Sequence, residues 1–255
     1  MSGHSWSVSR TALTFLFDDL GLGVPLPFEP NHPYTTAAER DACRERTHRE
    51  LADAGLVRDG VIARRMLSTL ARGPVALVAM GALGEDVLLA RACWDGQNAV
   101  LAQQTDADTV TVTEIGHPDL IDAVVRLVPD AEAARGISVR VPLDGQADRV
   151  DAGESVYNDF GPSAGSRAVA TMFGNGVSRC GAFVPVYEGT ERLPVTWFDT
   201  VAEGSRDDTG IARWFGTTTN DSNGTPWTTY VPGDNSRIRQ ALHAVVEPLR
   251  QRSGA

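Results

Sequence analysis

Lysine is absent from this chain of 255 residues, and all 23 of its basic side chains are arginine. Acidic side chains outnumber them at 33, which gives a formal net charge of −10 at pH 7. Such a surface repels nucleic acid and anionic lipid, so binding to DNA, RNA or a membrane surface is disfavoured. The same charge favours solubility, as a protein that covers the apolar surface of another protein requires.

Cysteine is scarce, and long apolar runs are missing. The three cysteines, Cys43, Cys93 and Cys180, form neither a CxxC pair nor a zinc-binding spacing, as expected of reduced thiols. No stretch approaches the roughly 18 uninterrupted apolar residues that a membrane-spanning helix needs. The N-terminal residues are polar and lack the apolar centre of a signal peptide. These absences predict a cytoplasmic protein without membrane insertion.

Common motifs for nucleotides and metals are missing as well. The chain contains no P-loop and no GxGxxG that opens a helix, and its five histidines form neither HxH nor HExxH. Asp106 and Asp108 lie close together, but the other ligands of a calcium loop do not follow them, so a polar hairpin turn is expected. The sequence therefore predicts no metal site and no cofactor.

One pattern occurs twice in the chain, at an offset of 117 positions. Residues 109–128 and residues 226–245 each read as a strand, a break at a glycine and an amphipathic helix. The offset places Gly116 on Gly233. Residue identity between the copies is low, so the shared order of elements matters more than the letters. We expect a single domain, residues 1–255, that is built from two pseudo-symmetric halves.

The first half, residues 1–135, combines helices with a run of strands. Its strand patterns are residues 75–83, 87–94, 98–104 and 109–115. Its helical patterns are residues 11–20, 36–54, 63–71 and 119–128. Thr36 and Glu39 match a capping box, which sets the start of the second helix. Short turns between the strands force antiparallel neighbours, because parallel strands need a long crossover.

The second half, residues 136–255, repeats this order. Its strand patterns are residues 137–141, 182–187, 194–198, 211–217 and 227–231. Its helical patterns are residues 163–173 and 236–249, and Asp234 or Asn235 is the expected N-cap of the last helix. The predicted fold class is α+β, with two pseudo-symmetric halves around a central antiparallel β-sheet flanked by helices.

A literal hydrolase motif lies at residues 161–165, which match G-x-S-x-G with Ser163 at the centre. Asp199 and His243 follow in the Ser…Asp…His order of α/β-hydrolases. The motif requires a buried strand directly before the serine and a parallel sheet, and neither is indicated here. We therefore predict that the chain is not an enzyme, and a serine hydrolase that uses Ser163 stays as an alternative.

Adjacent aromatic residues occur on two strands of the second half, as Trp197-Phe198 and Trp214-Phe215. Neighbouring side chains on a strand point to opposite faces. One member of each pair is then expected off the helix-packed core, where clustered aromatic residues bind other proteins. Two alternatives stay open. In the first alternative, both sheet faces are covered and all four rings belong to the core. In the second, the aromatic face pairs with a second copy of the chain in a homodimer.

Three stretches, in chain order, carry a resemblance to a known family. The first runs from residue 20 to residue 57, and the second is a helix, a Gly-rich turn and a strand at residues 170–184. The third combines Val195–Thr200, Ala212–Trp214 and Trp227–Asp234, with the order aromatic-Asp-Thr, Arg-aromatic and Trp…Val-Pro-Gly-Asp. Together they resemble the EspG family, the cytosolic chaperones of type VII (ESX) secretion in actinobacteria. The likeness covers nearly the whole chain.

The resemblance implies two related halves around a central antiparallel sheet and a non-enzymatic role. Proteins of this family bind the tip of a PPE protein within a helical PE–PPE heterodimer, keep it soluble and direct it to its secretion system. A sheet face with its loops would cover an apolar helical tip that otherwise aggregates. The expected mechanism is reversible, stoichiometric masking without nucleotide or metal.

The resemblance also places the partner-binding residues in three regions. They are the hairpin residues Gly84, Glu85 and Asp86, the strand residues Trp197, Arg213 and Trp214, and Arg237 and Gln240 on the last helix. Two loops depart from the family pattern. The hairpin loop at residues 81–86 is shorter than usual, and the loop between Thr200 and Ala212 is longer and acidic.

Overall fold

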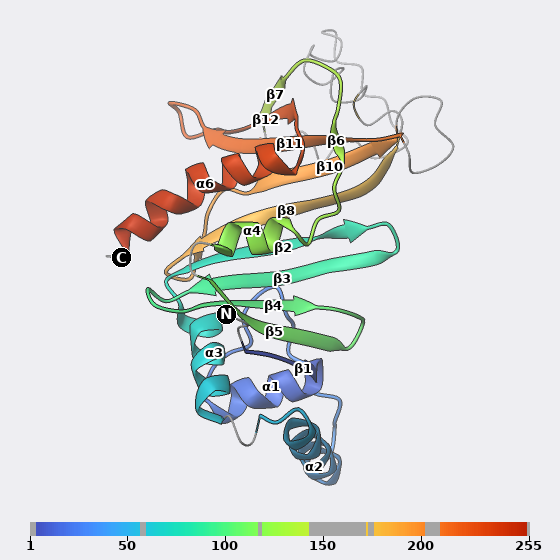
Figure 1. Cartoon of the computed structure of the whole chain (residues 1–255), viewed down its shortest axis with the longest axis vertical. Coiled ribbons are helices and arrows are strands. Elements are labelled where there is room, and N and C mark those ends of the chain that lie inside the picture. Colours follow the sequence, from blue (N-terminus) through green and yellow to red (C-terminus); the bar gives the residue numbers. More distant parts are fainter. Residues whose placement is uncertain are drawn as a thin grey trace.

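The centre of the molecule is a 12-stranded sheet with helices on both faces (Figure 1). The structure is a computed structural model of the chain, and it describes residues 4–56, 60–116, 119–142, 172, 176–201 and 210–253. All strand pairs are antiparallel within these ranges, apart from the short parallel pair of β6 (Glu132–Ala133) with β11 (Ile211–Asn220).

The chain enters at one edge of the sheet and builds that side first. In chain order the elements are β1 (Ser5–Ser9), α1 (Arg10–Asp19), α2 (Ala37–Asp53), α3 (Gly60–Arg72), β2 (Val75–Leu83), β3 (Asp86–Trp94), β4 (Ala99–Gln104), β5 (Thr109–Ile115) and α4 (Leu120–Val125). The remaining elements are β6, β7 (Val139–Pro142), β8 (Val177–Tyr187), β9 (Thr190–Glu191), β10 (Val195–Val201), β11, β12 (Pro226–Pro232) and α6 (Asn235–Arg252).

The strand order reads alike from either edge of the sheet. The strands lie in the order β1-β5-β4-β3-β2-β8-β10-β11-β12-β7. β2 and β8 pair at the centre of the sheet. The next strands of the chain lie successively further out on each side, and a strand from earlier in the chain, β1 or β7, forms the edge. α4 follows β5, as α6 follows β12. We propose that residues 1–135 and 136–255 are the two halves of this arrangement, as the repeated pattern predicts.

Helices cover the two faces of the sheet at different places. α4 and α6 pack on one face, here the α4/α6 face, where Leu77 and Trp197 belong to one buried cluster with Ile238 of α6. α1 and α3 pack on the other, here the α1/α3 face, where Met66 of α3 and Val78 of β2 share a second cluster. Figure 1 shows α1, α2 and α3 gathered beyond β5, with α4 and α6 across the middle of the sheet.

Local hydrogen bonds set the starts of α2 and α6. The Thr36 hydroxyl accepts from the Glu39 N–H at 3.2 Å, and the Glu39 carboxylate accepts from the Thr36 N–H at 3.0 Å, which confirms the predicted capping box. Hydrogen bonds from the backbone of Thr35 and Thr36 lower the pKa of Glu39 to about 2. Asp234 caps α6 by accepting from the Arg237 N–H at 3.0 Å.

The clearest difference from the sequence prediction is the start of β8. The sequence predicts a strand at residues 182–187, whereas β8 begins at Val177 and pairs with both neighbours. Gly181 lies inside the strand because the Trp197 side chain covers it. A Cβ at Gly181 would lie 2.9 Å from the Trp197 indole and 2.6 Å from the carbonyl oxygen of Met80. Gly181 looks like a loop residue in the sequence, but it marks a position where the backbone of β2 and the Trp197 ring approach β8 closely.

Candidate partner-binding surface

The β2–β3 hairpin carries the predicted residues Gly84, Glu85 and Asp86 at its tip, and all three are exposed. Leu83 pairs with Asp86, which leaves a two-residue turn. Gly84 has a φ of 76°, which glycine adopts without steric cost and which suits the first position of such a turn. β4 pairs with β3 only from Ala90 on, so the hairpin projects past its neighbour (Figure 1).

Apolar side chains at the hairpin end of the sheet lie open on the α1/α3 face. The strand register places them side by side on β3, β2 and β8, and we call this set the open strand face: Met80, Ala82, Val87, Leu89, Cys180 and Ala182. Val87 is 60% exposed and Met80 is 37% exposed. Apolar residues gathered on one open face are typical of a surface that binds another protein.

Arg91 borders the open strand face on the side of α1 and α3. Its buried guanidinium donates from Nε to the Leu70 carbonyl oxygen at 2.9 Å and from a terminal nitrogen to the Leu26 carbonyl oxygen at 3.2 Å. Burial lowers the pKa of Arg91 from its ordinary value. The two carbonyl groups belong to α3 and to the connector after α1, so Arg91 ties both segments to the sheet. The Leu26 side chain is 56% exposed at this margin.

The strand residues that the resemblance assigns to partner binding are buried in the described chain. Trp197 and Trp214 are 1% and 7% exposed, and Arg213 is fully buried. Trp197 and Phe198 do lie on opposite faces: Trp197 is in the α4/α6 cluster, whereas Phe198 and Trp214 pack with Tyr230 on the other face. Both faces are covered at these rings, so their contact with a partner stays a prediction.

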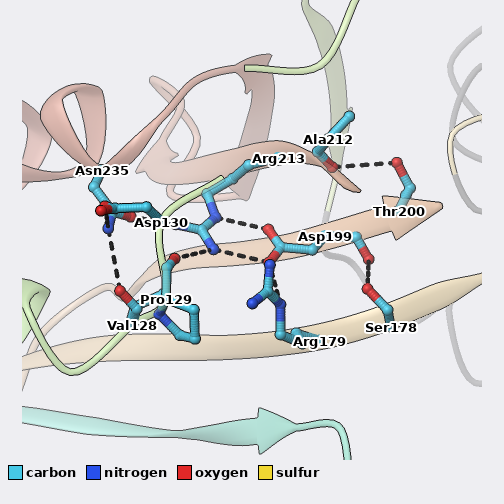
Figure 2. A network of polar contacts seen from close by, with 10 residues as sticks. All are labelled: Val128, Pro129, Asp130, Ser178, Arg179, Asp199, Thr200, Ala212, Arg213 and Asn235. Atoms are coloured by element: carbon cyan, nitrogen blue, oxygen red, sulfur yellow. Dashed lines mark hydrogen bonds and ion pairs between the residues drawn. The ribbon is translucent and has the colours of Figure 1, made fainter. Parts of the chain in front are cut away.

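Arg213 lies at the centre of a buried polar network (Figure 2). Its guanidinium binds the Asp199 carboxylate through two hydrogen bonds, from Nε to Oδ1 at 2.6 Å and from a terminal nitrogen to Oδ2 at 2.8 Å. The same guanidinium donates to the Pro129 carbonyl oxygen at 2.8 Å and to the side-chain oxygen of Asn235. It also lies 5.0 Å from the centre of the Trp197 ring.

Asn235 extends this network to the segment after α4. Its side-chain nitrogen donates to the Val128 carbonyl oxygen at 3.1 Å and to Asp130 Oδ1 at 2.8 Å. The network thereby joins β10, β11, the segment after α4 and the first turn of α6. A buried charge is tolerated only when it is paired and hydrogen-bonded. Arg213 therefore positions α6 on the sheet.

Arg237 and Gln240, the remaining predicted residues, are exposed on α6. The other side of the helix is buried, with Ile238 and Leu242 in the α4/α6 cluster. α6 thus presents Arg237 and Gln240 on one side of the sheet, and the open strand face lies on the other. The structure does not gather all the predicted residues into one surface. The hairpin tip is the predicted region that borders both sides.

The open strand face is the feature that the sequence prediction missed. The local pattern pointed away from an open face. Residues 75–80 are apolar without alternation, which is typical of a strand covered on both faces. β2 is indeed buried from Val75 to Ala79, but it is exposed at Met80. The position at which the cover of the helices ends depends on strand register and helix packing, which no local pattern contains.

The acid of the hydrolase alternative, Asp199, is engaged in another contact. Ser163 and the predicted helix at residues 163–173 lie outside the described residues, apart from one position of the helix. The Asp199 carboxylate is held by two arginines, and His243 is exposed on α6. A catalytic triad needs the carboxylate to orient the histidine. Asp199 therefore has a structural role in the network around Arg213.

The described residues show neither a metal-binding cluster nor a membrane-spanning helix. Within its ranges, no group of three or more His, Cys, Asp or Glu side chains is arranged to hold a metal ion. Asp106 and Asp108 form the expected polar turn, in which the Asp106 carboxylate accepts from the N–H groups of Asp108 and Thr109 at 2.9 and 2.8 Å. Among the described helices, none combines the length and apolar character needed to span a membrane.

Comparison with known proteins identifies the family. The EspG family model matches residues 9–244 of this chain. The chain belongs to the EspG family. The match includes most of the sheet and both layers of helices, so the resemblance found in the sequence is confirmed. No curated protein matches this EspG-family sequence. Membership in the family favours a non-enzymatic protein.

A solved relative shares the fold of this EspG-family chain. It is the Mycobacterium tuberculosis type VII secretion system chaperone EspG5, in a complex with a PE25–PPE41 dimer. The two chains superpose with a TM-score of 0.56 and 12% sequence identity, over 96% of this chain and 97% of that chain. The likeness confirms the α+β class, with a large antiparallel sheet flanked by helices.

Proposed function

We propose that this EspG-family chain is a cytoplasmic chaperone or adaptor of type VII (ESX) secretion. Its client is a PPE protein within a PE–PPE heterodimer. The chain covers the apolar tip of the PPE protein, keeps it soluble and directs it to export. The observation that carries the proposal is the family match over residues 9–244. The relative EspG5 was solved with a PE25–PPE41 dimer, which supports a client of this class.

The open strand face and the β2–β3 hairpin supply a surface for this role. Val87 and Met80 are the exposed apolar anchors on that surface. Complete burial of one such side chain stabilises a complex by about 1.5–3 kcal/mol. The short turn at Gly84 holds the hairpin in one conformation, so little conformational entropy is lost when a client binds.

We infer further that the chain has no catalytic activity, because masking an apolar tip requires no bond to be made or broken. The serine hydrolase alternative makes a different prediction. If Ser163 is a nucleophile, Ser163→Ala abolishes a hydrolytic activity. In the chaperone function the same variant binds its client as the wild type does, which a pull-down with the purified variant measures.

The experiment that tests the proposal is co-expression with each PE–PPE pair of the same genome, with an affinity tag on this chain only. We expect one pair to elute with the chain as a soluble 1:1:1 complex in size-exclusion chromatography. The PPE protein of that pair should be insoluble when this chain is left out.

Failure of every pair to form a soluble complex would contradict the proposal. The free chain then serves as the second measurement. Association that rises with concentration in the absence of any client would favour the homodimer alternative, in which the aromatic sheet face pairs with a second copy of the chain. A free chain that stays monomeric and binds no pair would exclude both functions.

A further inference from the structure

Two arginines share one buried carboxylate in the network around Asp199. Arg213 and Arg179 both contact the single Asp199 carboxylate, and Arg179 Nε lies 2.8 Å from Oδ2 (Figure 2). The side chains of Asp199 and Arg213 are fully buried, and that of Arg179 is 16% exposed. Asp130, a second acid of the network, is bound by Asn235 and not by an arginine. The three groups in direct contact, Arg213, Arg179 and Asp199, carry a formal charge of +1.

Arg213 alone is sufficient to pair with Asp199. It binds both carboxylate oxygens, and two further N–H donors are taken by Pro129 and Asn235. Arg179 is the additional cation. Its Nε is at ion-pair distance from Asp199 without an aligned hydrogen bond, and within the described residues no second acid pairs with its guanidinium. A partly desolvated arginine that shares its one acid gains from a further anion.

Arg179 lies beside the tip of the hairpin that is expected to reach the client. On one side its backbone pairs with Asp199, and on the other with Leu83, the last residue of β2 before the turn. Strand partners directly opposite each other project to the same face, so Arg179 and Leu83 share the α4/α6 face next to the hairpin tip. This local positive charge stands out on a chain with a net charge of −10.

We propose that Arg179 is an anion receptor of this chain, and that it binds one carboxylate side chain of the client beside the β2–β3 hairpin. The inference rests on the proposed function. A guanidinium presents a planar fork of donors that matches a carboxylate, and the pair gains strength where water is partly excluded. The exposed acids of the hairpin tip, Glu85 and Asp86, repel a strongly acidic segment. The fit is therefore a single acidic residue within a mainly apolar client surface.

The test measures client affinity by titration calorimetry for the wild type, Arg179→Gln, Arg179→Lys and Arg192→Gln. Arg192 is the matched control, because it is exposed beyond the opposite end of β8 and stacks on Tyr187 at 5.7 Å. Arg179→Gln and Arg192→Gln change the net charge equally. We expect Arg179→Gln to weaken binding about tenfold, Arg179→Lys to recover part of the loss, and Arg192→Gln to change affinity by less than about twofold.

The salt dependence separates a client contact from a structural role. The affinity of Arg179→Gln should fall less steeply with salt than that of the wild type, since one charge pair is removed from the interface. Melting temperatures of the free variants report any loss of folding. Equal affinity and equal salt dependence of Arg179→Gln and the wild type would overturn the inference while the proposed function stands. A wild-type chain that binds no PE–PPE pair would instead overturn the proposed function.

A second measurement does not depend on how the Arg179 variants fold. Each acidic residue in the client segment that contacts the wild-type chain is replaced by its amide. The affinity of each variant client for the wild-type chain is then measured. One replacement should weaken binding to the wild-type chain about tenfold. If no replacement changes the affinity by more than about twofold, a carboxylate receptor at Arg179 is excluded.

Discussion

The substitution Asp199→Asn tests the buried network directly. Asparagine has nearly the same shape as aspartate, so the change removes a charge and leaves the packing in place. Asp199 and Arg213 are both fully buried, and Arg213 has no other acid partner among the described residues. Removing one member of a buried ion pair costs about 3–5 kcal/mol, because the other charge stays buried without compensation. We expect a loss of stability of that size.

The melting temperature of Asp199→Asn should fall as well. In a domain of this size, each kcal/mol lost lowers the melting temperature by about 2–4 °C, so Asp199→Asn should lower it by about 6–20 °C. Trp197, whose ring Arg213 contacts, is one of the five tryptophans whose fluorescence reports unfolding. Urea unfolding followed by fluorescence and by circular dichroism measures the free energy of unfolding.

The control is an ion pair that remains in solvent. Arg44 and Asp19 lie 3.4 Å apart with side chains that are 57% and 50% exposed. Arg44→Ala should cost no more than about 1 kcal/mol, since water screens such pairs. If Asp199→Asn costs as little as Arg44→Ala, the Asp199 carboxylate does not hold Arg213 in place and the reasoning on the network is wrong.

Four further changes test other parts of the structure. Gly181→Ala places a Cβ against the Trp197 indole and should cost about 1–3 kcal/mol in urea unfolding. Gly84→Ala meets no atom within 4 Å and should cost about 1 kcal/mol through its positive φ alone. Val87→Glu should weaken client binding about tenfold in titration calorimetry with an unchanged melting temperature, because Val87 is exposed. Glu39→Ala should remove stability that is present above pH 4.5 and disappears as the pH falls through about 2, so the stability curves of variant and wild type converge there.

Each of these expectations has a clear contrary result. Equal stability of Gly181→Ala and Gly84→Ala would show that the Trp197 ring moves aside freely. Full client affinity of Val87→Glu would remove the open strand face from the proposed interface. A constant difference between the stability curves of Glu39→Ala and the wild type, from pH 7 down to about pH 2, would show that the charge of Glu39 is not what the capping box uses.

Elements with local signals were predicted well. The strand patterns at residues 75–83 and 109–115 coincide with β2 and β5, and the capping box of Thr36 and Glu39 starts α2. A strand period or a cap depends on residues that are neighbours in the sequence, so a short window contains the whole signal. The start of β8 was missed because Gly181 is explained by a ring on another strand and not by its own neighbours.

The candidate surface was predictable only in part. The hairpin tip at Gly84 follows from the turn chemistry together with the family resemblance, and the structure places it in the open. Trp214 was expected at the partner surface, yet Ala134 and Val139 belong to the cluster that covers it. Those two residues come from a segment without a strong pattern, so its packing could not be anticipated.

By itself, the sequence determined the fold class, the helix starts and the membership of the EspG family, because periodicity, caps and the order of motifs are all written along the chain. Only the tertiary structure decided which strand faces are open and which charges are buried. Gly81 meets Gly181 only when β2 pairs with β8, and Asp199 meets Arg213 only when β10 pairs with β11. Burial depends on everything that packs over a residue, and that is a property of the whole fold.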